Sequence, residues 1–171
     1  FETDMAAYTG SPRAVATVNG TAALHVALKL AGVVPGDLVI TQPLTFVATC
    51  NAIAYCQADP VFVDVDRHTM GLSAHALESW LADNAVVEGD TCLTRSDHRH
   101  IRACLPMHTF GMPADLDGLL AVCARWKLAL VEDAAESLGS LYQGRHTGTF
   151  GLLGTLSFNG NKIITTGGGG M

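Results

Sequence analysis

The residue with the clearest chemical potential is Lys162, which ends the segment SFNGNK at residues 157–162. It is the only lysine after Lys127, and a hydroxyl, two amides and a glycine stand close before it instead of other charges. An amine in such a polar turn can form an imine with the carbonyl group of a cofactor. The alternative is an ordinary surface lysine, and the four glycines at 167–170 could be only a flexible linker.

Asp133 is a candidate partner for a ring nitrogen. It follows the apolar run 128–131, in the segment VEDAAE at residues 131–136. A carboxylate at the carboxyl end of a buried strand lies where ligands bind in α/β sheets. It can keep a pyridine nitrogen protonated, which turns the ring into an electron sink. A helix cap or a metal ligand is the alternative interpretation of this residue.

Two further segments complete a possible cofactor site. The segment NGTAA at 19–23 stands at a strand-to-helix junction, where backbone N–H groups and the helix N-terminus favour an anion, and Thr21 adds a hydroxyl. Phe46 follows another strand and could lie against a flat heterocycle. Alone, these segments could be a helix cap without a ligand and a core phenylalanine. Together with Lys162 and Asp133, they supply the phosphate turn, ring neighbour, pyridinium partner and lysine that pyridoxal phosphate requires.

Alternating strands and helices must position these segments. The expected strands are 14–18, 37–40, 60–64, 101–107, 128–131 and 155–158, with 163–166 as a weaker candidate. The expected helices are 21–30, 46–55, 115–126 and one that Ser73 caps, with Ala76, Leu77, Trp80 and Leu81 on one face. The polar, aperiodic stretch 87–100 is expected to be a surface loop. This alternation predicts an α/β domain with a mostly parallel sheet covered on both faces.

Composition limits the class of protein. The chain has 171 residues, which fits one domain, and it is 49% hydrophobic and 15% charged. A net charge of −6 and the absence of a Lys/Arg run argue against binding of nucleic acid. The uncharged stretch 38–58 is long enough to cross a bilayer, but its Gln, Pro, Thr and Asn residues favour a strand, a turn and a buried helix. We therefore expect no membrane association.

The ends and the cysteines add three expectations. The chain does not begin with Met and stops just after the glycine run, so we expect a fragment. No secretory signal opens it. The five cysteines include no CxxC pair, so we expect mostly buried thiols in a reducing cytoplasm and no metal site.

These segments resemble, in order and over nearly the whole chain, the sugar-nucleotide aminotransferases of the DegT/DnrJ/StrS type. The resemblance lies in GTAAL (20–24), TFVAT (45–49), FVDV (62–65), HTFG (108–111), EDAAES (132–137) and SFNGNK (157–162), of which the last two are the most specific. The resemblance implies fold type I of the aspartate aminotransferase superfamily. Residues 1–171 are then part of the three-layer αβα large domain that binds pyridoxal 5'-phosphate, and the C-terminal small domain is absent.

The resemblance also implies a role for each matched residue. Lys162 carries the cofactor and moves the proton in catalysis, Asp133 binds the pyridinium nitrogen, and Phe46 covers the ring face. Glu136, where many relatives have Gln or His, lies near the ring hydroxyl. The phosphate is held by Gly20, Thr21, Ala22 and Ser157, with Asn159 as a further contributor.

The implied activity is transfer of an amine from an amino-acid donor, usually glutamate, to the keto group of a nucleotide-linked sugar, by a cytoplasmic homodimer in surface-glycan biosynthesis. The run 159–170 is most similar to the branch that makes 4-amino sugars for legionaminic-acid-like or bacillosamine-like glycans. The alternatives are a sugar dehydratase of the same family, in which histidine replaces the lysine, a lyase on the same fold, or a catalytically silent binding or regulatory relative. A dehydrogenase is excluded because 19–24 is not a G-x-G-x-x-G turn.

Overall fold

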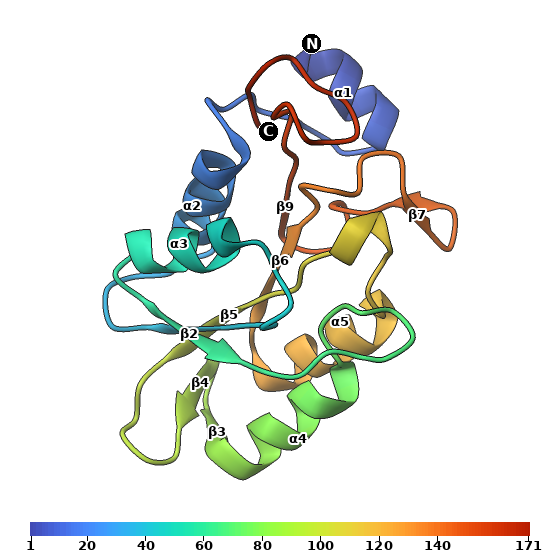
Figure 1. Cartoon of the computed structure of the whole chain (residues 1–171). Coiled ribbons are helices and arrows are strands. Elements are labelled where there is room, and N and C mark those ends of the chain that lie inside the picture. The colour runs from blue at the N-terminus through green and yellow to red at the C-terminus, as the bar shows by residue number, and fades with distance from the viewer.

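A parallel sheet of five strands, in the order β2-β1-β5-β6-β9, forms the centre of the molecule (Figure 1). The computed structural model describes all residues from Phe1 to Met171. The strands are β1 (Leu38–Thr41), β2 (Asp59–Phe62), β5 (Ile101–Leu105), β6 (Ala129–Asp133) and β9 (Leu153–Thr155). All four pairings are parallel. Strands β1, β5 and β6 are buried over most of their length, which explains why they are continuous apolar runs in the sequence.

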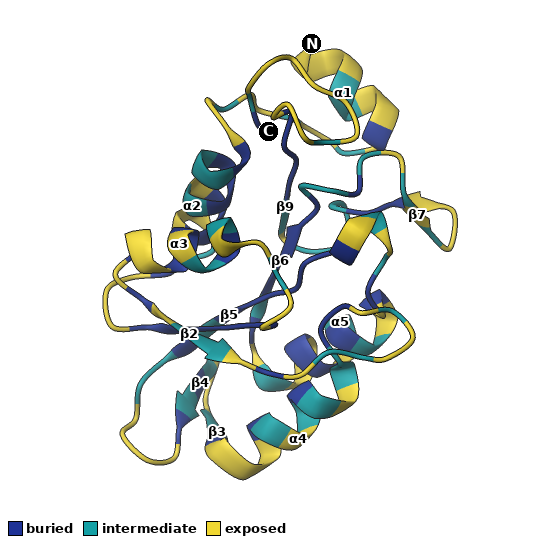
Figure 2. Cartoon of the chain, viewed as in Figure 1, coloured by how far each residue is buried: buried dark blue, intermediate teal, exposed yellow.

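Helices cover both faces of this sheet, as predicted. Helices α2 (Gly20–Leu30) and α3 (Val47–Tyr55) share one buried cluster with Val39 of β1. Helices α4 (Ala74–Asn84) and α5 (Leu116–Trp126) share a second buried cluster with Leu38 and Ile40, the residues on either side of Val39 in β1. Because successive side chains of a strand point to opposite faces, the two clusters lie on opposite sides of the sheet. The buried positions of Figure 2 follow the sheet and the inner sides of these helices. The three-layer αβα architecture is therefore confirmed.

Side chains cap the N-termini of helices α2, α4 and α5. Ser73 accepts a hydrogen bond from the N–H of Ala76, so its predicted capping role is confirmed. Asp115 does the same for the N–H of Gly118 at the start of α5. Pro106 follows β5 and has no N–H to donate, which explains why that strand ends at Leu105 and not at the predicted residue 107.

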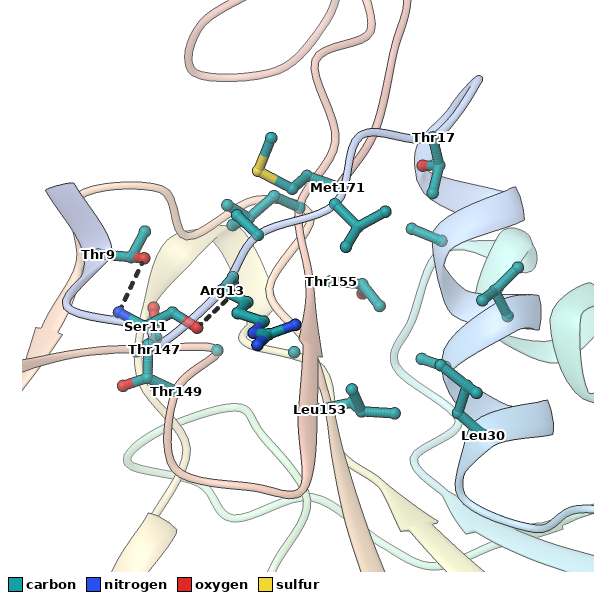
Figure 3. A pocket seen from close by; sticks show the side chains of 18 residues that line it. Thr9, Ser11, Arg13, Thr17, Leu30, Thr147, Thr149, Leu153, Thr155 and Met171 are labelled. Carbon is teal, nitrogen blue, oxygen red and sulfur yellow. Dashed lines mark hydrogen bonds between the residues drawn. The ribbon is translucent and has the colours of Figure 1, made fainter. Parts of the chain in front are cut away.

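The predicted strand at 14–18 is wrong. Only Thr17 pairs there, in an isolated antiparallel bridge with Gly170. A cavity of about 270 Å³ separates this segment from β9, so its backbone has no neighbouring strand to pair with (Figure 3). The weaker candidate at 163–166 is also not a strand, and the strand predicted at 155–158 instead ends at Thr155.

The predicted loop at 87–100 is wrong in its first part. Residues 85–94 form an antiparallel hairpin of β3 (Ala85–Glu88) and β4 (Thr91–Thr94). Gly89 at φ +60° begins its two-residue turn, which is a conformation that glycine adopts without steric cost. Ala85 and Cys92 are buried against the cluster of α4 and α5, so the hairpin is fixed to the domain by its apolar side.

Three short elements were not anticipated. They are helix α1 (Glu2–Thr9), the 3-10 turn η1 (Thr109–Gly111) and the hairpin of β7 (Leu141–Tyr142) and β8 (Arg145–His146). The N-terminus lies near the C-terminal segment, where the rings of Phe1 and Phe158 lie edge to face with centroids 5.4 Å apart (Figure 1). No helix in the structure is both long and apolar enough to span a bilayer.

Candidate functional site

A cavity of about 280 Å³ lies where β6 and β9 end and α2 begins. Its volume is close to the lower end for small-molecule sites, about 300 Å³. Residues 157–171, red in Figure 1, return to the start of α2, where Gly169 pairs with Asn19. The cavity is lined by eight of the nine residues expected from the sequence, namely Gly20, Thr21, Phe46, Asp133, Glu136, Ser157, Asn159 and Lys162. The fold thus brings together segments that are far apart in the chain.

One end of the cavity has the properties of an anion site. The backbone N–H groups of Gly20 and Thr21, the first two of helix α2, donate to no protein acceptor. The Cβ and Oγ of Ser157 lie 2.7 and 2.9 Å from the place where a Cβ on Gly20 would be, so only glycine lets this hydroxyl approach the helix start. Free amides, a hydroxyl and the positive end of a helix dipole together favour a phosphate group.

Ala22 is the one expected residue that does not line the cavity. Its N–H donates to Oδ1 of Asn19 at 2.8 Å, so the chain itself uses this amide as a helix cap. Asn19 also lies in the cavity wall. The sequence analysis had not assigned a role to this residue.

The other end of the cavity holds the buried carboxylate of Asp133, which is 3% exposed. Its Oδ2 accepts the hydroxyl proton of Thr49 at 2.7 Å, and its Oδ1 accepts the N–H of Ala135 at 3.2 Å. Burial raises the pKa of Asp133, and these two hydrogen bonds lower it only in part. None of the ion pairs in the chain includes Asp133. A protonated ring nitrogen would supply the cation that this carboxylate lacks.

Lys162 lies between a carboxylate and an aromatic ring. Its Nζ is 3.3 Å from Oε1 of Glu136 and 5.7 Å from the centroid of the Phe46 ring. The Lys162 side chain is only 10% exposed, whereas Phe46 is 58% exposed and is therefore not the core residue that the alternative interpretation required. Glu136 also accepts the N–H of Phe110 at 3.3 Å, and this bond connects it to the 3-10 turn η1. These contacts hold the amine inside the cavity and leave the aromatic ring at its edge.

A second buried carboxylate, Glu132, supports the site from the opposite face of β6. It accepts the N–H groups of Gly148, Phe150 and Gly151 at 2.6 to 2.7 Å and lies 3.1 Å from Nε2 of His108. Nδ1 of His108 accepts a backbone N–H from residue 114, so the neutral ring carries its proton on Nε2 and donates it to Glu132. Burial acts to raise the pKa of Glu132, but these donors hold it below its ordinary value. The sequence analysis gave Glu132 and His108 no role.

Thr49 and Met107 are further site residues that were missed. Thr49 follows Thr45 by four residues, a helical spacing, although Thr45 lies just before α3, and Phe46 stands between them in the sequence. That spacing was the available signal. Met107 lines the cavity beside Asp133, and no pattern in the sequence distinguishes it from a core residue.

The cavity beside β9 differs from this site in chemistry. Arg13 is its only ionisable side chain, and most of the residues that line it belong to the N-terminal segment, α2 and β9 (Figure 3). The two cavities are similar in volume, so the convergence of Lys162, Asp133 and Glu136 identifies the candidate site and size does not. No group of three or more His, Cys, Asp or Glu side chains is arranged to hold a metal ion, and the five cysteines are free thiols.

Comparisons with known proteins agree with this geometry. The sequence profile of the DegT/DnrJ/EryC1/StrS aminotransferase family matches residues 1–171. The chain is 42% identical to the GDP-perosamine synthase of Caulobacter vibrioides over 171 residues, which is all of this chain and 42% of that protein. It thus spans less than half the length of this curated relative.

Solved structures show the same fold. The crystal structure of 3-amino-5-hydroxybenzoic acid (AHBA) synthase matches with a TM-score of 0.85 and 33% identity, over 99% of this chain and 40% of that one. The structure of DesI in the presence of its TDP-sugar product matches with a TM-score of 0.83 and 30% identity, over 99% of this chain and 38% of that one.

Proposed function

The chain belongs to the DegT/DnrJ/EryC1/StrS aminotransferase family, and from this premise we propose that it forms the cofactor-binding part of a sugar aminotransferase. Pyridoxal phosphate is the cofactor of this family. The observation that carries the proposal is the convergence of Lys162, the buried Asp133 and an open anion site at the start of α2 in one cavity. The acceptor we propose is a keto group on a nucleotide-linked sugar, and the donor is an amino acid, with glutamate as the first to test.

The residues of the cavity fit this cofactor at both of its polar ends. Gly20, Thr21 and Ser157 supply amide and hydroxyl donors for the phosphate, with Asn159 nearby in the wall. Asp133 supplies the carboxylate for the ring nitrogen. When bound, the cofactor supplies an aldehyde carbon that accepts amines and a protonated ring that withdraws electrons.

The contributions of the chain itself are to bind, orient and move protons. Lys162 supplies the nucleophilic amine, and once that amine is free it can take and return a proton at Nζ. Glu136, at 3.3 Å, holds the Lys162 amine in place, and we propose that it also contacts the ring hydroxyl of the cofactor. Phe46 presents an aromatic face beside Nζ, at the edge of the cavity, where it can cover the ring. Asp133 keeps the ring nitrogen protonated.

The finer assignments are part of the same proposal. We propose a cytoplasmic homodimer acting in surface-glycan biosynthesis, of the branch that makes 4-amino sugars, and we propose that residues 1–171 are the partial large domain. The similarity of residues 159–170 to that branch supports the proposal that the product is a 4-amino sugar. The presence of Lys162 disfavours the dehydratase alternative, because in that branch a histidine replaces this lysine. A lyase or a silent relative differs from the proposal in what happens to the amino donor.

The test uses the intact protein with pyridoxal phosphate, reduction by borohydride, and mass spectrometry of the peptide that contains Lys162. We expect the reduced cofactor to be attached to Lys162. The variant Lys162→Ala should lose the attachment and the borohydride-sensitive visible absorption, whereas Lys29→Ala, on the exposed end of α2, should keep both.

The second step of the test adds glutamate. We expect it to bleach the visible band and release 2-oxoglutarate, with the amine appearing on the sugar when a nucleotide-linked keto sugar is added. Attachment of the cofactor to another lysine would contradict the role of Lys162. Release of ammonia or sulfide in place of amine transfer would favour a lyase.

A further inference from the structure

A chain of two threonine hydroxyls connects helix α3 to Asp133. Thr49 is fully buried, and its Oγ1 donates to Oδ2 of Asp133 at 2.7 Å. Oγ1 of Thr45 lies 2.6 Å from Oγ1 of Thr49 and 3.1 Å from Sδ of Met107. Thr49 is the only side chain that makes a hydrogen bond to this carboxylate, since the other bond comes from the backbone of Ala135.

The number of available protons gives this row of hydrogen bonds a direction. An ionised carboxylate only accepts, so the single hydroxyl proton of Thr49 is used on Asp133, and Thr45 must then donate its own proton to Thr49. If Asp133 is neutral, the direction can reverse: Asp133 donates to Thr49, Thr49 to Thr45, and Thr45 to the sulfur of Met107. The same atoms therefore satisfy Asp133 in both of its charge states without any side chain moving.

We propose that Thr49, supported by Thr45, is a positioning residue that holds Asp133 ionised and oriented toward the ring nitrogen of the cofactor. This inference rests on the proposed function and adds two residues to it. A hydrogen bond from a hydroxyl group to a charged acceptor is stronger than one between neutral groups. It is stronger again in a buried site of low dielectric constant. Thr49 is also β-branched and helical, so its side chain has few rotamers and keeps the carboxylate in one orientation.

The surroundings of Asp133 leave this role to Thr49. Burial raises the pKa of Asp133, and the hydrogen bond from Thr49 is the strongest of the contacts that lower it. Lys162 and Glu136 share the cavity with this carboxylate, and His108 acts on it from the other face of β6. Lys162 and His108 lower the pKa of Asp133 less than Thr49 does, and each lies within 3.3 Å of another carboxylate, Lys162 of Glu136 and His108 of Glu132. Without the hydroxyl, the only hydrogen bond left to the ionised form would be the one from the Ala135 amide.

The experiment compares four variants of the intact protein: Thr49→Val, Thr49→Ser, Thr45→Val and Thr41→Val. Thr41→Val is the matched control, because Thr41 is equally buried and loses a 2.7 Å hydrogen bond to the carbonyl of Leu105, a bond that does not include the Asp133 side chain. Two quantities are measured. The first is the titration of Asp133 in the cofactor-free protein, followed by ¹³C-carboxyl NMR and assigned with Asp133→Asn. The second is the dissociation constant of pyridoxal phosphate.

We expect Thr49→Val to raise the pKa of Asp133 by about one unit and to weaken cofactor binding about tenfold. Thr49→Ser keeps the hydroxyl and should stay within about twofold of wild type for binding. Thr45→Val should give a smaller change in the same direction, and Thr41→Val no change in either quantity. This ordering separates the hydroxyl chain from a general loss of packing.

Unchanged Asp133 titration and cofactor affinity in Thr49→Val would overturn the inference. An equal change in Thr41→Val would also overturn it, since the effect would then be one of packing. If Thr49→Val does not fold, Thr45→Val and Thr49→Ser give the answer through the same two quantities. Failure of wild type to bind pyridoxal phosphate would overturn the proposed function, whereas the titration of the cofactor-free protein would still decide whether Thr49 acts on Asp133.

Discussion

Glu132 and Asp133 are adjacent carboxylates at the end of β6, and their surroundings differ completely. Both are buried, with 0% and 3% exposure, and they point to opposite faces of the strand. Glu132 accepts three backbone N–H groups from the turn at 148–151 and a fourth donor from His108. Asp133 accepts two donors, one of them a neutral hydroxyl, and faces the cavity.

The opposite shifts in pKa express this difference. Burial acts to raise both pKa values, but the donors around Glu132 reverse the effect and those around Asp133 do not. The protein itself supplies the hydrogen-bond donors that the Glu132 carboxylate needs, so this residue stabilises the fold. The Asp133 side is incomplete without a cationic ligand, which is the expected property of a functional carboxylate. The start of α2 shows the same contrast between Ala22, whose N–H is capped, and Gly20 and Thr21, whose N–H groups are open.

The largest effect that this comparison predicts is on stability, from Glu132→Ala. The substitution leaves the buried His108 and three half-buried N–H groups without an acceptor, so we expect the free energy of unfolding to fall by roughly 3–5 kcal/mol. Urea unfolding of the cofactor-free protein measures this. The control is Glu88→Ala, on an exposed position of β3, which should change stability by less than about 0.5 kcal/mol. A loss below about 1 kcal/mol at Glu132 would mean that the two carboxylates do not differ as described.

Asp133→Asn should have a smaller effect of opposite sign in the cofactor-free protein. Because the pKa of Asp133 is raised, its contribution to stability is fully present below the ordinary carboxylate pKa of about 3.9 and is lost as pH rises through the higher pKa of the folded state. Asparagine avoids this loss, so we expect the variant to be more stable than wild type by roughly 0.5–2 kcal/mol at pH 7.

Thermal or urea unfolding at pH 4 and pH 7 checks the sign. The advantage of the variant should shrink toward pH 4, and the same variant should bind pyridoxal phosphate more weakly. A variant that is less stable than wild type at pH 7 would show that the Asp133 side is also complete within the chain.

Much of this arrangement could be predicted from the sequence because it depends on local patterns. The apolar runs of β1, β5 and β6, the helical patterns between them and the cap at Ser73 predicted the parallel sheet and its covering helices. The identity of the carboxylate that faces the cavity also followed a local rule, since Asp133 is the last residue of its strand. The roles inferred for Lys162, Asp133 and the α2 start stay predictions until they are tested, although the fold brings these residues into one cavity.

The features that were missed depend on contacts between distant segments. The strand predicted at 14–18 has strand-like residues, but pairing needs a neighbour, and a cavity lies where that neighbour would be. The role of Glu132 depends on a turn that follows it by 16 to 19 residues, and that of Thr49 on a carboxylate 84 residues away. Residue types alone do not reveal such partners. The assignment of Ala22 depended on the neighbouring Asn19, whose choice between a cap and a ligand contact is visible only in three dimensions.

The smallest effect is expected at the start of α2, from Asn19→Ala. The variant loses the side-chain cap on the N–H of Ala22, so we expect about 1 kcal/mol lower stability, measured by urea unfolding. Asn84→Ala is the control, since Asn84 is an exposed helix-end residue that donates to a carbonyl and caps no N–H group. Affinity for pyridoxal phosphate should stay within a few-fold of wild type, because the N–H groups of Gly20 and Thr21 and the hydroxyl of Ser157 remain in place. A loss of affinity without a loss of stability would instead assign Asn19 to the ligand, and the division between capped and open amides at this helix would have to be redrawn.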